Sequence, residues 1–381
     1  MRELGIYVHI PFCAKKCDYC DFISYSSVEE KAENYIKAVL DEIEWMSGEI
    51  EDDAIISSVY IGGGTPSYIP SSYIIEILDK IHNYFYGRIE NPEITIEVNP
   101  GTVTKEKIKD YKEAGVNRIS IGLQATQDRL LEQIGRVHTY EQFLDSYGII
   151  VNSGFLNVNI DIMLGLPNQS LEELEETVEK VIHLRPAHIS IYSLTLEENT
   201  KLYQQIKNGE LKLPNEEIER IMYWRTKRNL EVNGYHHYEI SNYAKPGKEA
   251  KHNLDCWDQK EYIGIGVAAH SYYNDIRYSN TNDLDTYIEN IENKEYKRNQ
   301  TIQELQDAIS KMKEFMILGL RKIDGIEMKR FQEKFGKDVF EIFEQELEKL
   351  QEARLLVVDE ETIKLTNRGL DFANVVWSEF V

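Results

Sequence analysis

Apolar residues in the first 195 positions follow two alternating patterns. Short runs rich in β-branched and aromatic residues predict strands at residues 4–10, 57–61, 93–98, 118–123, 156–164 and 188–194. Between these runs, apolar residues recur three and four positions apart with charged residues in the gaps, which predicts amphipathic helices. The helices are expected at residues 28–45, 71–84, 105–114, 140–152 and 171–184. Such alternation is typical of βα units around a parallel sheet.

Six strands separated by five helices predict an α/β fold, a partial (β/α)6 TIM-like barrel. Polar motifs follow several of the predicted strands, and in such barrels the carboxyl ends of the strands meet at one mouth. We therefore expect the functional site at that mouth, in a barrel domain that covers residues 1–233.

The pattern changes twice after the barrel. Residues 234–300 are rich in glycine and aromatic residues and predict an accessory segment against the barrel. From residue 301 the pattern predicts a helix to residue 320, a second from residue 325, a third over residues 337–353, and a hairpin of residues 355–359 and 363–366. This order is winged-helix-like, so residues 301–381 are predicted to form a small C-terminal α+β domain.

The charge balance restricts the partners of the chain. It carries 66 acidic and 43 basic residues, a formal net charge of −23, which repels a polyphosphate backbone. No nucleic acid is therefore expected as a partner. No apolar run approaches the roughly 20 residues needed to span a bilayer, and no signal-peptide pattern follows Met1. A cytoplasmic location is expected.

Three of the four cysteines crowd into eight residues directly after the first predicted strand. Cys13, Cys17 and Cys20 have the spacing C-x3-C-x2-C, and thiolates so close in sequence can converge on one iron–sulfur cubane and leave one iron without a protein ligand. Two other interpretations stay open. One is a zinc site that adds His9 to the three thiolates, and the other is a group of buried thiols.

Polar residues also stand at the ends of the neighbouring strands. The segment Gly62-Gly63-Gly64-Thr65-Pro66 follows the second strand, where bare backbone can approach a ligand and donate N–H groups. Glu97 ends the third strand and Gln124 follows the fourth. Asp161 is a charge inside an apolar strand, where a carboxylate needs partners, and Arg136 could clamp a carboxylate. Each residue alone has an ordinary capping or surface interpretation, but together they predict a polar ligand.

The cysteine motif, with Tyr19 directly before its third cysteine, resembles the hallmark of the radical SAM superfamily. The segment of residues 62–66 resembles the GGGTP loop of that superfamily, which binds the methionine amino group of S-adenosylmethionine. The resemblance implies a [4Fe–4S] cluster on the three cysteines, with S-adenosylmethionine bound at the open iron.

Over nearly its whole length the chain resembles the oxygen-independent coproporphyrinogen III oxidase family, and most closely the heme-chaperone branch of that family, HemW. The resemblance implies a set of residues that contact S-adenosylmethionine. These are Tyr7, Tyr19, Gly64, Thr65, Pro66, Glu97, Gln124, Arg136 and Asp161.

The chain departs from the oxidases in two features and from the chaperone branch at one position. The oxidases carry a fourth cysteine where this chain has Phe22, and also an extension ahead of the cluster, whereas twelve residues precede Cys13 here. The chaperone branch carries H-N-x-x-Y-W, and this chain has His252-Asn253-Leu254-Asp255-Cys256-Trp257. His252 and Cys256 are candidate heme ligands, since both residue types serve as axial ligands. The alternative is a structural histidine and a buried thiol.

Three functions fit these residues. The first is a heme chaperone that binds heme as cargo, a [4Fe–4S] cluster and S-adenosylmethionine, and delivers heme to hemoproteins, with transient membrane-protein partners among the recipients. The second is an oxygen-independent coproporphyrinogen III oxidase, an enzyme that decarboxylates porphyrinogen propionates. The third is a zinc-stabilised binding module.

Overall fold

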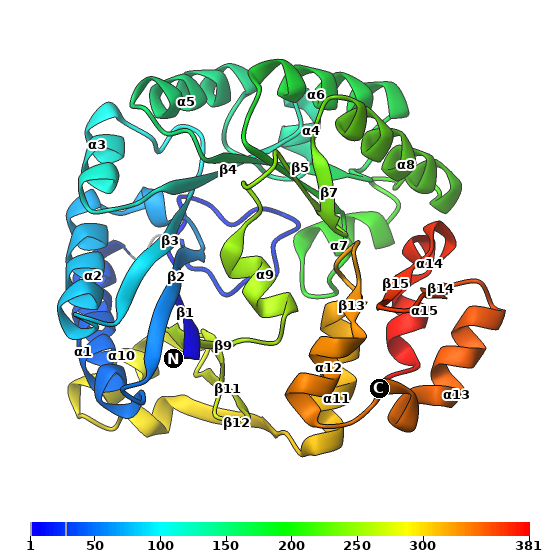
Figure 1. The fold of residues 1–381 in the computed structure, drawn as a ribbon. Helices are drawn as coiled ribbons and strands as arrows, with labels where there is room; N and C mark the ends of the chain where they lie inside the picture. Colours follow the sequence, from blue (N-terminus) through cyan, green and yellow to red (C-terminus); the bar gives the residue numbers. More distant parts are fainter. Residues whose placement is uncertain (1, 27–28) are drawn as a thin grey trace.

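A computed structural model describes residues 2–26 and 29–381 of the chain. Its centre is a 12-stranded sheet in which β1 to β6 lie in sequence order, each parallel to the next. Their bounds are β1 Arg2–Ile10, β2 Ala54–Gly63, β3 Ile89–Val98, β4 Arg118–Gln124, β5 Val158–Leu164 and β6 His188–Ser193. All six predicted strands are confirmed, and the sheet curves into an open barrel (Figure 1).

Helices form an arc around the outside of these strands (Figure 1). Their bounds are α1 Ala32–Glu49, α2 Ser71–Tyr84, α3 Lys105–Glu113, α4 Asp128–Gln133, α5 Tyr140–Asn152 and α6 Leu171–Leu184, with 3-10 helices η1 Glu29–Lys31 and η2 Pro66–Tyr68. The predicted bounds of α2, α5 and α6 are confirmed, whereas the predicted start of the first helix at Val28 lies outside the described residues. Capping boxes at Thr139 and Ser170 explain why α5 and α6 begin where they do.

The pleat of β1 separates the two faces of the sheet. Leu4, Ile6 and Val8 are fully buried in the layer between the strands and the outer helices. Each such side chain contributes about 1.5–3 kcal/mol by leaving water. Tyr7 and His9 alternate with them, and so project from the opposite face into the lumen of the barrel. Residues with chemistry therefore reach the lumen without interrupting the core.

The segment that follows the barrel adds strands to both edges of the sheet. After α7 Lys201–Lys207 and α8 Glu216–Val232, the strands β7 His236–Glu239 and β8 Asn242–Ala244 extend the edge beside β6. After α9 Lys251–Trp257, β9 Glu261–Ile265 runs parallel to β1, and β10 His270–Tyr273, β11 Ile276–Asn280 and β12 Gln300–Leu305 follow it outward. Helices α10 Leu284–Glu292 and η3 Tyr296–Asn299 connect β11 to β12. The expected accessory segment is thus part of the same sheet.

The predicted helix start at residue 301 is wrong. Residues 301–305 belong to β12, which pairs antiparallel with β11. The misleading signal was Ile302, Leu305 and Ile309, whose spacing imitates a helical face but whose side chains are exposed. The helix begins instead at α11 Ala308–Gly319, because the side chain of Asp307 accepts a hydrogen bond from the N–H of Ser310 and caps it.

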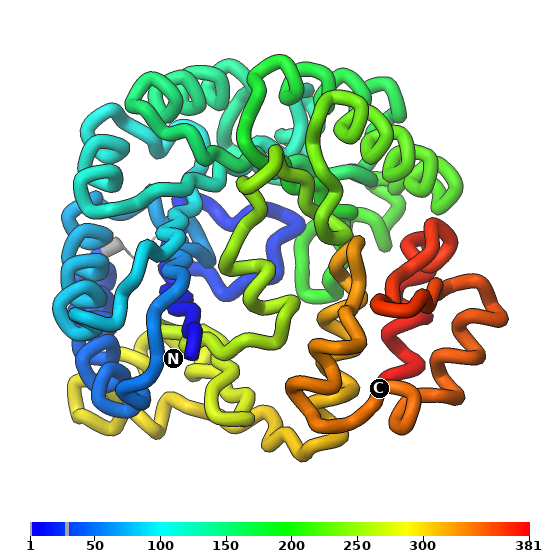
Figure 2. Tube along the Cα trace, viewed as in Figure 1, coloured from blue at the N-terminus to red at the C-terminus, as the bar shows by residue number. Residues whose placement is uncertain are grey.

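The C-terminal residues have their own core. Its elements are α11, β13 Ile326–Glu327, α12 Met328–Phe335, α13 Val339–Glu352, β14 Leu356–Val358, β15 Thr362–Leu365, α14 Asn367–Asp371 and α15 Ala373–Ser378, which is the winged-helix-like order. Phe315, Phe331, Phe343 and Phe380 pack edge to face in a cluster separate from the barrel core. Figure 2 shows this part as a distinct body beside the barrel. Among the described helices, none has the length and apolar character that a membrane crossing requires.

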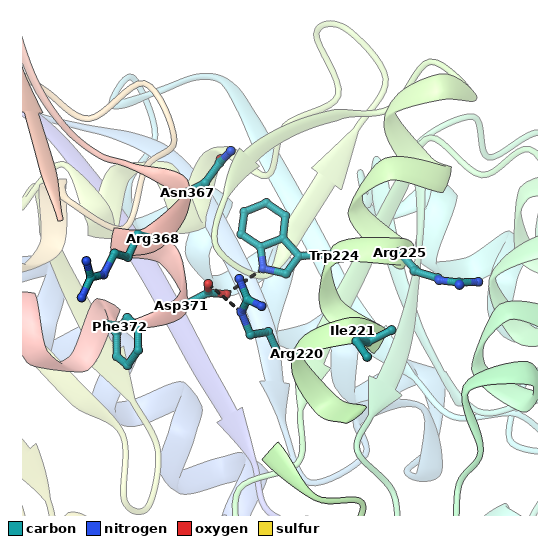
Figure 3. Close-up of a pocket in the computed structure, with 8 residues that line it drawn as sticks. All are labelled: Arg220, Ile221, Trp224, Arg225, Asn367, Arg368, Asp371 and Phe372. Carbon is teal, nitrogen blue, oxygen red and sulfur yellow. Dashed lines mark hydrogen bonds and ion pairs between the residues drawn. The ribbon is translucent and has the colours of Figure 1, made fainter. Parts of the chain in front are cut away.

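One carboxylate joins the C-terminal part to the barrel. Asp371 at the end of α14 accepts hydrogen bonds from Arg220 Nε (2.8 Å) and Trp224 Nε1 (2.7 Å), both on α8. The side chain of Asp371 is 10% exposed. Figure 3 shows it reaching across to α8. A cleft of about 880 Å³ lies between α8 and α14.

Asp371→Ala should lower the free energy of unfolding by about 1–3 kcal/mol, because it leaves the Trp224 and Arg220 donors unpaired at this junction. Urea unfolding followed by tryptophan fluorescence measures the change. The matched control is Asp324→Ala, since Asp324 is an exposed turn residue. Equal losses in the two variants would show that the junction does not depend on Asp371.

Candidate functional site

The three motif cysteines lie in the loop that follows β1: Cys13, Cys17 and Cys20. Asp18 ties the middle of this loop to the barrel mouth. Its N–H donates to Ile134 O (3.0 Å), and its carboxylate pairs with Lys201 Nζ (2.7 Å). Gly135 has φ +76°, and a Cβ there would come within 2.9 Å of Asp18 N. Glycine is therefore needed at residue 135 for the loop to sit so close.

The three thiols line one cavity of about 570 Å³ at the carboxyl ends of the parallel strands. Cys13 Sγ lies 3.5 Å from Thr65 Oγ1, and Arg136 Nη1 donates to Cys17 Sγ at 3.7 Å. Burial raises the pKa of the Cys13 thiol and raises that of Cys20 to about 11, and the neighbouring Cys17 adds to both shifts. The thiols of Cys13 and Cys20 therefore stay protonated by themselves, whereas a bound metal centre would take them as thiolates.

The glycine-rich loop after β2 packs against the cysteine loop through its backbone. Gly64 N donates to Ile10 O and Thr65 N donates to Phe12 O, each at 2.8 Å. A Cβ on Gly64 would lie 2.9 Å from both of these carbonyl oxygens. We expected the amides of this loop to face a ligand, and for these two the expectation is wrong, because they hold the cysteine loop in place.

Glu97, at the end of β3, is half-buried in the lumen. Tyr60 OH donates to Glu97 Oε1 at 2.8 Å, and Gly63 N donates to Oε2 at 3.2 Å. Burial raises the pKa of this carboxyl to about 7, against the opposing effect of the hydrogen bond from Tyr60. A cationic group that enters the cavity would lower the pKa of Glu97 again, so an ammonium group could form an ion pair with this carboxylate.

Asp161 on β5 is half-buried and accepts hydrogen bonds from two side chains. Ser120 Oγ donates to Asp161 Oδ2 at 3.0 Å, and Asn159 Nδ2 donates to Oδ1 at 2.7 Å. Burial nevertheless raises the pKa of Asp161. Asp161 thus has protein partners on β4 and β5, and its role toward a ligand stays a prediction.

Arg136 stands beside the cysteines and is held from the strand ends. Its Nη2 donates to Asn99 Oδ1 (2.9 Å) and to Gly122 O (2.8 Å), while its buried Nε has no hydrogen-bond partner among the described residues. Gln124 ends β4 with φ 71°, at a register shift that follows Gly122. This left-handed backbone turns the chain out of the strand at the cavity wall.

The structure brings together most of the residues predicted to form the site. The first cavity is lined by Cys13, Cys17, Tyr19, Cys20, Gly64, Thr65, Glu97, Gln124, Arg136 and Asp161. Pro66 is buried at the start of η2 and does not line it. The cavity wall also includes Asn99 and Tyr192, which sequence reasoning missed. Asn99 directly follows a predicted strand, so its position was a usable signal, whereas Tyr192 sits within a strand and gave none.

Tyr7, His252 and Cys256 lie elsewhere. They line a second cavity of about 900 Å³. Asp21 and Phe22, directly after the third cysteine, line both cavities. The cysteine loop therefore separates two neighbouring cavities. One lies beside the thiols, and the other lies beside α9, the helix with the HNxxxW residues 252–257.

Helix α9 carries His252 and Cys256 into this second space. His252 is buried, its Nδ1 lies 2.9 Å from Ser58 Oγ, and its ring centroid lies 5.2 Å from that of Tyr60. Burial lowers the pKa of His252 to about 4 and raises that of the Cys256 thiol to about 12. Both side chains are therefore neutral at pH 7.

His9, the fourth ligand of the zinc alternative, is engaged away from the thiols. Its Nδ1 lies 3.0 Å from Tyr7 OH, and its Nε2 lies 2.8 Å from Ile23 O. It lines the second cavity and not the one that holds the cysteines. Among the described residues, no three histidine, cysteine or carboxylate side chains form a group that could hold one metal ion. A cubane spreads its thiolates over separate irons, so this finding does not count against a cluster.

Comparison with known proteins first gives the class. Residues 7–181 match the radical SAM superfamily, and residues 306–372 match the HemN C-terminal domain. A solved structure with the same fold is coproporphyrinogen III oxidase (HemN) from Escherichia coli, which aligns with a TM-score of 0.86 at 23% identity over 100% of this chain and 90% of that one. At this identity the match shows the fold alone.

Curated relatives give the family. Heme chaperone HemW of Bacillus subtilis is 36% identical over 98% of each chain, and that of Lactococcus lactis is 36% identical over 98% of this chain and 96% of its own length. A zebrafish relative, radical S-adenosyl methionine domain-containing protein 1, is 32% identical over 97% of this chain and 84% of its own. The chain belongs to the radical SAM superfamily and, within it, to the HemW family.

Gly63→Ala should lower the free energy of unfolding by about 1–3 kcal/mol, because φ is +111° there. An added Cβ would also lie 2.4 Å from the ring of His9. The control is Gly48→Ala in α1, where a Cβ meets nothing within 4 Å and a gain of about 0.5–1 kcal/mol is expected. Urea midpoints of the two variants give the comparison. Similar free energies of unfolding for the two variants would mean that His9 and its neighbours in the lumen move aside at little cost.

Proposed function

We propose that this protein is a cytoplasmic heme chaperone that binds heme as cargo, holds a [4Fe–4S] cluster with S-adenosylmethionine, and delivers heme to hemoproteins, including transient membrane-protein partners. The observation that carries the proposal is the pair of adjoining cavities. The first cavity is lined by the cysteines and by polar residues at the ends of the strands, and the second is lined by His252 and Cys256 of the HNxxxW segment. Relatives over the full length of the chain are named heme chaperones, which supports the same function.

The first cavity suits an iron–sulfur cluster. Its thiols are half-buried, and the pKa values of Cys13 and Cys20 are raised, a state that a cluster would relieve by binding them as thiolates. Arg136 would neutralise part of the charge of such thiolates, since it already donates to Cys17. The bound cluster would supply one-electron chemistry.

The same cavity offers groups for S-adenosylmethionine. Glu97 would bind the amino group, Asp161 the ribose hydroxyls, and Arg136 the carboxylate, with Tyr19, Gly64, Thr65 and Gln124 completing the wall. Two proposed contacts lie behind this wall. Tyr7 stacks on Tyr60, the tyrosine that donates to Glu97, and Pro66 starts the turn behind the glycine loop. We assign both a positioning role.

The parts of the chain would divide the work. We propose a radical SAM barrel over residues 1–233, a segment over residues 234–300 that carries the heme residues, and a C-terminal domain over residues 301–381 that contacts recipient proteins. The oxidase alternative gains no specific support. At the position of the fourth oxidase cysteine stands Phe22, whose side chain is 68% exposed between the two cavities.

Cys17→Ala should remove most of the iron and sulfide from anaerobically reconstituted protein, because one corner of the cubane loses its ligand. Iron and sulfide analysis with an EPR spectrum of the reduced protein measures the effect. Cys256→Ala is the matched control and should keep both, since Cys256 lines the other cavity. Stoichiometric zinc in place of iron would reject the cluster.

Hemin added to the full chain should give a Soret band, and His252→Ala should bind hemin about tenfold more weakly, a loss of about 1.4 kcal/mol. His252 and Cys256 are our candidate ligands on α9, so Cys256→Ala belongs in the same titration. His183→Ala is the control, because His183 is exposed on α6 outside the barrel. If hemin mixed with the wild-type protein keeps the absorption spectrum of free hemin, the chaperone function is rejected.

A further inference from the structure

The second cavity differs in chemistry from the rest of this acidic protein. The charged residues among those lining it are Asp21 and Arg298, although the chain carries 66 acidic residues. Phe22, Ile23 and Tyr262 give the wall apolar surface, and the rest of the lining is mostly uncharged polar side chains of Ser, Thr, Asn and Gln residues. A flat, largely apolar molecule with anionic substituents fits such a lining better than a cation does.

Three imidazoles line this cavity, and their availability differs. Both ring nitrogens of His9 already have partners, Tyr7 OH and Ile23 O. His252 is buried and shares its Nδ1 with Ser58. His270 is exposed, and within the described part of the chain neither of its ring nitrogens has a hydrogen-bond partner. An entering metal ion would therefore meet a free nitrogen at His270.

The sheet fixes the position of His270. It begins β10 and pairs with Ser279 on β11, which lines the same cavity. On the other side, a Cβ at Gly264 would come within 2.1 Å of His270 O, so the glycine lets β10 lie close against β9. The imidazole is thus carried by a strand that has neighbours on both sides and not by a loop, which suits a ligand that must hold one geometry.

The protonation state of His270 also fits ligation. The protein covers part of the exposed His270 ring, and this partial loss of water lowers the pKa of the imidazole, as does the positive charge of Arg277. His270 is near enough to His9 to lower the pKa of that ring as well. A neutral imidazole keeps the lone pair that binds iron.

We propose that His270 is an axial ligand of heme iron in the second cavity, and that Arg298, which already forms an ion pair with Glu295, also pairs with a heme propionate. This inference rests on the proposed heme-binding function and deepens it, because it names a ligand outside the HNxxxW helix. His270 is the accessible imidazole of the cavity, so it meets incoming heme before the buried His252 does.

The test is hemin titration of the full, anaerobically reconstituted chain, with absorption and EPR spectra for wild type, His270→Ala and His236→Ala. His236 is the matched control, an exposed strand histidine at the far edge of the sheet. His270→Ala should bind hemin about tenfold more weakly and lose the spectrum of histidine-ligated iron. Added imidazole should restore that spectrum, which a merely structural role would not allow.

The outcomes separate this inference from the function on which it rests. A wild-type ligation spectrum in His270→Ala, with hemin still bound, would overturn the assignment of His270 and leave the chaperone function standing. Hemin that fails to bind the wild-type chain would overturn both. Equal effects of His270→Ala and His236→Ala, with unchanged iron content and circular dichroism, would also reject His270 as a ligand.

Discussion

The site depends on two backbone hydrogen bonds between the loops that follow β1 and β2. Gly64 N and Thr65 N donate to the carbonyls of Ile10 and Phe12, and this pairing continues the parallel register of the two strands past their ends. It holds the start of the cysteine loop over the lumen. A side chain at residue 64 would separate the loops, since its Cβ would contact both carbonyl oxygens. The absence of a side chain there is therefore a structural requirement.

The pleat of β1 then decides which residues meet a ligand. Alternate positions of this strand point outward into the helix layer or inward to the lumen, so Tyr7 and His9 share one face. Because β9 pairs with the free edge of β1, that face continues beyond the six barrel strands. The cysteine loop crosses this face, and its residues Asp21 and Phe22 touch the spaces on both sides.

The two cavities differ in the charge of the residues that line them. In the first, burial raises the pKa values of Glu97 and Asp161, and Arg136 approaches the thiols. Such a set gains from a ligand that brings both signs of charge, as a zwitterionic amino acid does. In the second, the histidines and Cys256 are neutral and charged groups are few. One loop thus separates a polar site from a largely uncharged one.

The sequence by itself determined much of the barrel and its polar ligands. Helical spacing with capping residues predicted the bounds of α2, α5 and α6, and the cysteine spacing and the strand-end residues predicted one shared cavity, because both depend on local geometry. Only the tertiary structure decided the rest. It paired β12 with β11 against a helical pattern, used the amides of Gly64 and Thr65 inside the protein, and placed Tyr7 in the second cavity. These outcomes depend on contacts between segments far apart in the chain, which no local pattern records.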